Sequence, residues 1–187
     1  MWALKASVAR RFREGEGTPA IVHRAGRRIP APSPRSNANT MRYLEDFHEG
    51  QVFELGEETI REQEIVEFAR RFDAQPFHVD AEAAKRSIYG GLIASGWHTA
   101  SFFMGLLVRS LLHDVASMGA GGIDELRWLK PVRPGDTLRG RLNVVGTRPS
   151  TKHADRGLLT CVGELFNRKD ERVLLIRWSA MIARRRP

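Results

Sequence analysis

A stretch of 22 residues from Ser87 to Val108 contains no Asp, Glu, Lys or Arg, and it constrains the fold more than any other segment. Its apolar residues predict a helix that starts near Gly90 or Gly91 and ends near His113. A stretch of this length could also span a bilayer. Polar side chains and glycines dilute its apolar character, however, so we expect no membrane segment. A helix that is apolar on most faces is then one that protein surrounds.

Strand patterns dominate the sequence after this helix. Runs of apolar and β-branched residues are bounded there by turn residues. The predicted strands there are residues 123–129, 137–147, 157–166 and 172–182. A further strand, residues 51–55, and an amphipathic helix with an acidic first turn at Glu62 and Glu64, which ends near Phe72, are predicted before the central helix. One buried helix and several antiparallel strands indicate an α+β domain whose sheet curls around the helix to cover it.

The positive charge of the chain lies at its ends. The formal net charge is +8, but residues 1–40 hold eight basic and two acidic side chains, and residues 184–186 are all arginine. Residues 41–183 carry a net charge of −1. No aromatic residues interleave with the terminal arginines, so we expect neither a nucleic-acid nor a membrane partner.

The composition of residues 30–39, rich in proline, serine and asparagine, predicts a basic, disordered extension over residues 1–40 and one folded domain over residues 41–187. An organelle-targeting peptide, or upstream sequence ahead of a functional start at Met41, are the alternatives for the extension. The single cysteine, Cys161, lies in a strand-like run where a buried, reduced thiol is expected. These features favour a cytoplasmic protein.

A carboxylate and an imidazole lie five residues apart in the segment Asp73-Ala74-Gln75-Pro76-Phe77-His78, directly after the predicted helix. Pro76 is expected to keep this segment from being helical. Segments that leave rigid helices often hold catalytic groups. The alternative is structural, with Asp73 in a helix C-terminal turn and His78 bonded to a backbone carbonyl. Spacing alone leaves both interpretations open.

Paired glycines, Gly90 and Gly91, stand where the central helix is predicted to begin. Glycine lets a ligand approach the backbone closely, and the first N–H groups of a helix are free to donate to negative charge. This pattern predicts an oxyanion site. A tight turn without any catalytic role is the alternative.

Three segments of the sequence resemble the MaoC-like dehydratases, which are hot-dog fold proteins related to the (R)-specific enoyl-CoA hydratases. The segments are Asp73-x-Gln75-Pro76-x-His78, the run from Gly90 to Thr99, and the run from Arg127 to Leu138. The resemblance extends from about Met41 to Ile182. It implies that residues 41–187 form a hot-dog domain, an antiparallel sheet wrapped around a long central helix.

The resemblance also implies a reaction. Asp73 and His78 would activate one water, which adds to a trans-2-enoyl thioester to give an (R)-3-hydroxyacyl product. An acyl-CoA is the expected form of the substrate. Gly90, or Gly91 if the alignment slips by one residue, would donate its N–H to the thioester carbonyl. No metal or organic cofactor is implied beyond the coenzyme A of the substrate, and a homodimer or a higher homo-oligomer is expected. Gln75 replaces the asparagine usual in the family, which puts rate and substrate range in question.

Further candidates come from the same motifs. Gln75, Ser95, Trp97 and His98 are predicted to bind substrate, with core packing as the alternative for Trp97 and His98. Arg127, Lys130 and Arg133 are predicted to contact the coenzyme A phosphates, with a solvated strand edge as the alternative.

Two other functions compete with the hydratase. A thioesterase of this fold usually needs a carboxylate on the central helix, and residues 92–112 contain no Asp or Glu. A binding protein for acyl thioesters without catalytic activity is the second rival, because Gln75 departs from the family pattern.

Overall fold

The computed structural model describes residues 41–185 of the chain, and the predictions for residues 1–40 lie outside this part. The elements in chain order are the 3-10 turn η1 (Leu44–Asp46), β1 (Val52–Thr59), α1 (Glu62–Phe72), α2 (Pro76–Val79), α3 (Ala81–Lys85), α4 (Gly96–Ser110), the 3-10 turn η2 (Leu112–Asp114), β2 (Ser117–Ala120), β3 (Glu125–Trp128), β4 (Thr137–Pro149), β5 (Arg156–Phe166) and β6 (Arg172–Ala183). Each predicted strand has a counterpart here. β2 was not predicted, and it includes Gly119 and ends directly before Gly121 and Gly122.

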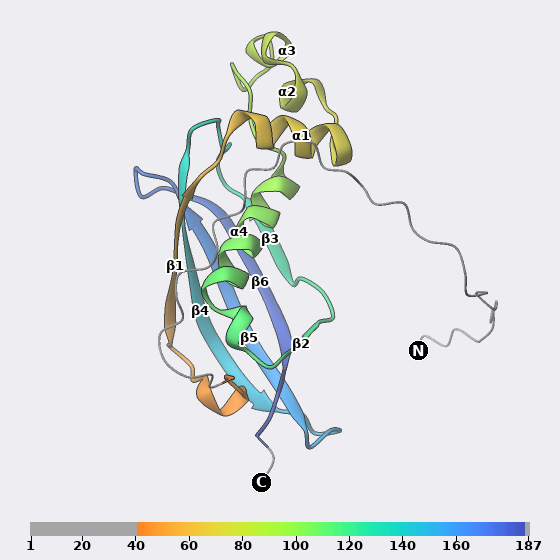
Figure 1. Ribbon diagram of the computed structural model, residues 1–187, viewed down its shortest axis with the longest axis vertical. Coiled ribbons are helices and arrows are strands. Elements are labelled where there is room, and N and C mark those ends of the chain that lie inside the picture. Colours follow the sequence, from red (N-terminus) through yellow and green to blue (C-terminus); the bar gives the residue numbers. More distant parts are fainter. Residues whose placement is uncertain (1–40, 186–187) are drawn as a thin grey trace, which may run out of the picture. The chain divides into compact units, whose positions relative to one another are not determined.

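The strands form one six-stranded sheet in the order β1-β4-β5-β6-β2, and β3 also pairs with β6. All of these pairings are antiparallel. Buried and half-buried side chains alternate along β5, because successive residues of a strand point to opposite faces of the sheet. The sheet curls around α4 (Figure 1), which confirms the predicted α+β arrangement.

The core lies between α4 and the concave face of the sheet. Phe103, Leu106 and Leu107 of α4 are buried there. Gly163 of β5 makes the contact possible, since a Cβ atom at this position would lie 2.2 Å from Cζ of Phe103. Removing these apolar surfaces from water contributes most of the favourable free energy of folding.

The predicted start of the central helix is wrong, because α4 begins at Gly96 and not near Gly90 or Gly91. The chain before it is extended, and the N–H of Ala94 donates to the carbonyl of Val132 at 2.8 Å. Ser95 then caps the helix by accepting a hydrogen bond from the N–H of Trp97 at 3.2 Å. The uncharged stretch thus contains a buried segment, residues 92–95, and a helix that is buried on one face only, because Trp97, Met104 and Val108 are more than one third exposed. The expectation that protein surrounds the whole helix therefore does not hold within this single chain.

The prediction that Pro76 prevents helical structure is also wrong. Pro76 is the first residue of the single-turn helix α2. Proline is well suited to this position, because the first N–H of a helix has no partner within the helix and the ring already fixes a helical φ. Within residues 41–185, no helix is both long and apolar enough to cross a membrane.

Candidate functional site

Asp73 and His78 face each other where α1 ends. Asp73 is the C-terminal cap of α1, and its N–H donates to the carbonyl of Ala69 at 2.8 Å. His78 lies on α2 and is only 4% exposed. Oδ2 of Asp73 lies 3.5 Å from Nε2 of His78. The structure therefore brings together the two groups that the sequence singled out.

Two neutral donors hold the carboxylate of Asp73. The hydroxyl of Ser95 donates to Oδ2 at 2.7 Å, and the side-chain amide of Gln75 donates to Oδ1 at 2.8 Å. The Ser95 hydrogen bond, followed by that of Gln75, lowers the pKa of Asp73 against the opposing effect of burial. Asp73 is therefore a carboxylate at neutral pH.

The hydrogen bond at the other ring nitrogen fixes the tautomer of His78. Nδ1 lies 2.8 Å from the carbonyl oxygen of Ile93. A carbonyl only accepts hydrogen bonds, so the proton of the neutral imidazole is assigned to Nδ1 and the lone pair to Nε2. Nε2 and Oδ2 of Asp73 are then two acceptors that face each other. A water molecule placed beside both can donate one hydrogen to each.

These contacts include both features of the structural alternative. Asp73 does lie at a helix C-terminus, and His78 does bond a backbone carbonyl. These contacts are also compatible with a catalytic role, because they orient the carboxylate and the imidazole toward each other. The sequence did not indicate which carbonyl would accept this hydrogen bond, because every residue type carries a backbone carbonyl.

Gly96 is the first residue of α4, and the ring of Trp128 covers it. Nε1 of Trp128 donates to the carbonyl of Gly96 at 2.7 Å. A Cβ atom on residue 96 would lie 2.5 Å from the Trp128 ring, so the position requires glycine. The N–H of a first helical residue has no acceptor within its helix. The Gly96 N–H also has no hydrogen-bond acceptor elsewhere in residues 41–185.

Gly90 and Gly91 do not lie in the first turn of a helix, which corrects their predicted placement. Gly90 adopts a φ of 62° in a bend, and its N–H already donates to the carbonyl of Ser87 at 3.1 Å. Gly91 packs against the guanidinium group of Arg133. At the start of the central helix, the N–H of Gly96 is free within residues 41–185. Serine is a preferred N-cap residue, so Ser95 is the local feature of the sequence that marks this helix start.

The predicted substrate-binding residues have different environments. Ser95 is fully buried and bonded to Asp73, so it orients the carboxylate and does not face substrate. Gln75 is exposed beside Asp73. Trp97 is 56% exposed, which rules out core packing, and its ring meets that of Trp128 edge to face at 5.5 Å.

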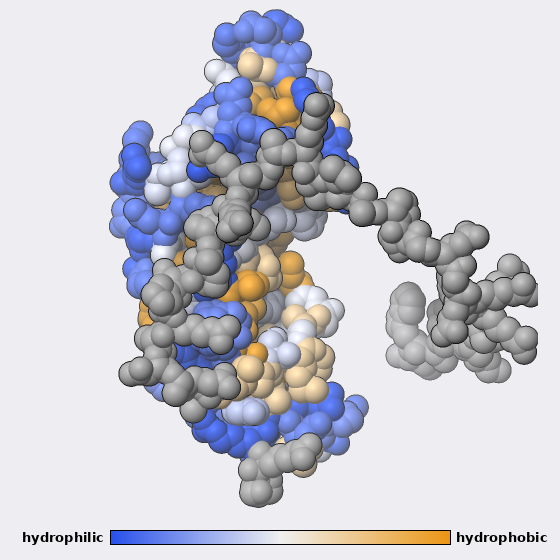
Figure 2. Space-filling view, viewed as in Figure 1, coloured by the Kyte–Doolittle hydropathy of each residue, from blue (hydrophilic) through white to orange (hydrophobic). Residues whose placement is uncertain are grey.

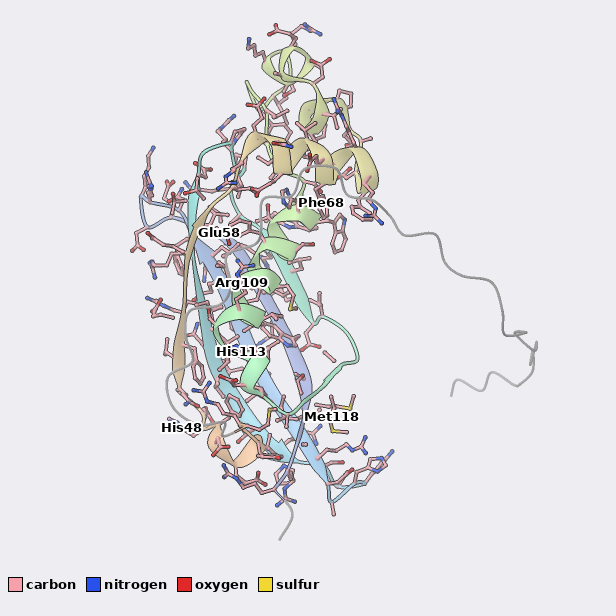
Figure 3. The ribbon with its side chains drawn as sticks, in the orientation of Figure 1. His48, Glu58, Phe68, Arg109, His113 and Met118 are labelled. Carbon is pink, nitrogen blue, oxygen red and sulfur yellow. The ribbon has the colours of Figure 1, made fainter. Side chains whose placement is uncertain are left out.

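His98 lines a hollow of about 320 Å³ to which β1, α1 and α4 contribute residues. Its ring stacks on Phe68 with the centroids 4.7 Å apart, and Phe68 is seen over the start of α4 in Figure 3. Glu58 of β1 and Arg109 of α4 form an ion pair that also lines the hollow. Burial lowers the pKa of His98, and its buried Nδ1 has no hydrogen-bond partner among the described residues.

Two of the three predicted phosphate-binding residues lie together. Lys130 and Arg133 line a second hollow, of about 290 Å³, whereas Arg127 forms an ion pair with Glu125 and is not among its lining residues. Within residues 41–185, no three His, Cys, Asp or Glu side chains gather into a group that could hold a metal ion.

The sequence model of the MaoC like domain matches residues 46–159. The chain belongs to the MaoC-like dehydratase family. The curled sheet around α4 is accordingly the hot-dog fold of that family, as predicted.

Relatives of this MaoC-like protein include both uncharacterised and named proteins. The uncharacterised protein YdeM of Bacillus subtilis is 30% identical over 75% of this chain and 99% of its own length. The (R)-specific enoyl-CoA hydratase of Rhodospirillum rubrum is 34% identical over 60% of this chain and 76% of its own length. A crystal structure of a MaoC-like dehydratase from Rhodospirillum rubrum superimposes with a TM-score of 0.70 at 38% identity, covering 78% of this chain and 99% of that one.

Proposed function

We propose that this MaoC-like protein is a hydratase of acyl thioesters, which converts a trans-2-enoyl-CoA to a (R)-3-hydroxyacyl-CoA or runs the reverse dehydration. The observation that carries the proposal is the pair of facing acceptors, Oδ2 of Asp73 and Nε2 of His78, at 3.5 Å. The similarity to an (R)-specific enoyl-CoA hydratase supports the substrate class and the stereochemistry.

The hydrogen bonds at the site suggest which of the two residues accepts the proton of the water and which one orients it. Asp73 is a weak base, because Ser95 and Gln75 already lower its pKa. His78 Nε2 would therefore accept one proton of the water while the water oxygen bonds to C3 of the enoyl group, and Asp73 would orient the other hydrogen. The imidazolium then returns that proton to C2, so one water is added in total.

The negative charge that develops on the thioester oxygen needs a donor. We assign this role to the N–H of Gly96, which lies next to Ser95 and so close to Asp73. Donors of this kind typically contribute about 10²–10³-fold to the rate. The ring of Trp128 leaves no room for a side chain at residue 96, so only a glycine fits at this position without movement of the ring or of α4.

The test is to follow the loss of enoyl-thioester absorbance with crotonyl-CoA and with longer or branched enoyl-CoA substrates. Asp73→Asn and His78→Ala should each lower kcat by about 10²–10⁴-fold. Asp80→Asn, at the exposed cap of α3, and His113→Ala, at an exposed turn, are the matched controls and should keep full activity. Binding of acyl-CoA without turnover by the unmodified protein would favour the binding function instead. Activity that survives both site substitutions would overturn the site.

The thioesterase alternative has no support from α4, because Gly96–Ser110 contains no Asp or Glu. The proposed hydration also needs no metal or organic cofactor. Activity should therefore persist after dialysis against EDTA, and its loss would contradict this part of the proposal.

A homodimer is part of the proposal. Apolar residues that are more than one third exposed gather on one side of α4 and on the nearby β2–β3 region, namely Trp97, Met104, Val108, Met118, Ile123, Trp128 and Leu129. Figure 2 shows apolar surface over these elements. Exposed patches of this kind usually mark interaction surfaces. Met104→Glu should shift the protein to a monomer in sedimentation velocity, whereas Ile88→Glu, at an isolated exposed position, should not.

A further inference from the structure

The guanidinium group of Arg133, in the turn between β3 and β4, bonds the backbone of residues 89–94, which are called the glycine bend below. Its Nη2 donates to the carbonyl of Tyr89 at 2.6 Å. A Cβ atom on Gly91 would lie 3.2 Å from Nη1, the nitrogen that does not make this bond. Arg133 is exposed, and Oδ2 of the neighbouring Asp136 already accepts from its backbone N–H at 2.7 Å. The guanidinium group is therefore a fixed contact of the bend despite its exposure.

Two neighbouring residues of the β3–β4 turn hold the glycine bend at both ends. Arg133 bonds the carbonyl of Tyr89, and the carbonyl of Val132 accepts from the N–H of Ala94 at 2.8 Å. Between these two points the chain contains Gly90 at a φ of 62°, and glycine gives a backbone more conformational freedom than any other residue does. Loss of the Arg133 bond would therefore release one end of a bend that has little stiffness of its own.

The glycine bend carries the carbonyl that orients His78. The carbonyl of Ile93 accepts from Nδ1 of His78 at 2.8 Å, and the N–H of Ile93 donates to the carbonyl of Phe77 at 3.3 Å. The bond at Nδ1 leaves Nε2 as the acceptor that faces Asp73. A shift of the bend would therefore change the orientation of His78 or the nitrogen that carries its proton.

Tyr89 also reaches His78 through aromatic packing. The ring of Tyr89 is tilted against that of Phe77, with the centroids 5.2 Å apart. The ring of Phe77 in turn meets the imidazole of His78 edge to face, with the centroids 4.5 Å apart. The attraction between such rings depends on their relative orientation. The position of Tyr89 thus affects His78 by two routes, through the backbone to Ile93 and through the ring of Phe77.

We propose that Arg133 is a positioning residue for His78. By holding Tyr89, Arg133 keeps the carbonyl of Ile93 in the place where it fixes the imidazole, with Nε2 left to accept a proton. This inference rests on the proposed function, in which that proton comes from water. Arginine suits the task, because its guanidinium group stays charged at all relevant pH values and hydrogen bonds from a charged donor are stronger than neutral ones.

The experiment compares Arg133→Met with a matched control, Arg168→Met. Arg168 is exposed and lines the same hollow as Arg133, but none of the hydrogen bonds to the glycine bend within residues 41–185 comes from it. Thermal unfolding checks that both variants are folded. The kinetic readouts are kcat and KM for crotonyl-CoA and for crotonyl-pantetheine, which lacks the phosphates of coenzyme A. ¹⁵N NMR separately reports the tautomer of His78, whose signals are assigned from the His78→Ala spectrum.

Arg133→Met should lower kcat about tenfold with both substrates, because one hydrogen bond from a charged donor is lost at a distance from the reacting atoms. KM should stay within about twofold. The NMR signals of His78 should show the Nδ1–H tautomer in the unmodified protein and in Arg168→Met, and a mixture of the two tautomers in Arg133→Met.

A folded Arg133→Met variant that keeps kcat and raises KM for crotonyl-CoA alone would overturn the positioning role and indicate contact with the carrier phosphates instead. An unchanged tautomer of His78 in this variant would overturn it too, as would an equal loss of kcat in Arg168→Met. Because the NMR measurement needs no turnover, the effect of Arg133 on His78 is tested even if the hydratase proposal fails.

Discussion

The hydroxyl of Ser95 lies 2.7 Å from Oδ2 of Asp73, the carboxylate oxygen that faces His78. Ser95 also caps α4 by accepting from the N–H of Trp97. One side chain therefore fixes the start of the central helix and the orientation of the carboxylate. In the proposed mechanism, a shift of α4 would move Asp73 and the Gly96 N–H together.

Ser95→Ala should change the pH dependence of activity as well as its size. The Ser95 hydrogen bond is the largest influence that lowers the pKa of Asp73, so its loss raises that pKa. Activity needs the carboxylate, and the acid limb of the kcat/KM profile should therefore move to higher pH. The lost cap also costs about 0.5–2 kcal/mol of stability.

The control for this effect is thermal unfolding of the same variant across the pH range of the assay. A variant that stays folded throughout, with an unchanged acid limb, would show that Ser95 has only a structural role. A limb that moves while the protein stays folded supports the positioning role.

Gly96→Ala tests which glycine serves the thioester oxygen. The added Cβ would lie 2.5 Å from the Trp128 ring, so either α4 or Trp128 must move, and kcat should fall by about 10²-fold or more. Gly91→Ala is the matched control, because its Cβ would meet only the flexible end of Arg133, at 3.2 Å. Activity should survive there. If steady-state kinetics showed instead that Gly91→Ala loses activity and Gly96→Ala keeps it, the oxyanion donor would be assigned to the Gly90–Gly91 bend.

The sequence singled out Asp73 and His78 together because they are only five residues apart, and the structure brings their side chains within 3.5 Å of each other. It misplaced the helix start because the residues before Gly96 are as apolar as those after it. What stops the helix is a long-range bond from Ala94 to Val132, which no local pattern shows. The lining of the hollow at Lys130 and Arg133 was predicted only in part, for the same reason. Lys130 and Arg133 belong to a recognised motif, whereas Arg168 and Lys169 join them only through the curl of the sheet.

Gly163→Ala should destabilise the domain. The new Cβ would lie 2.2 Å from Cζ of Phe103, a fully buried residue at the centre of α4. Overpacking of this kind typically costs about 1–3 kcal/mol. Gly146→Ala, where a Cβ would meet no atom within 4 Å, is the matched control. Urea unfolding should show a lower midpoint for the first variant only, and equal midpoints would contradict the packing of Phe103 against β5.

His98 should make the domain less stable as the pH falls. Burial lowers the pKa of His98 from its usual 6.5, so the unfolded chain binds a proton at a higher pH than the folded one does. Its contribution to stability is then fully present above about pH 6.5, the pKa expected for the unfolded chain, and decreases as the pH falls below that value.

The groups that face His98 in the hollow are Glu58, Glu64 and Arg109, and only Glu64 raises the pKa of His98. His98→Phe should keep the stack on Phe68 and flatten the decline of unfolding free energy between pH 7 and pH 5, as measured by urea titration. His113→Phe, at an exposed turn, should leave that decline unchanged, and the same slope in both variants would rule out His98 as its source.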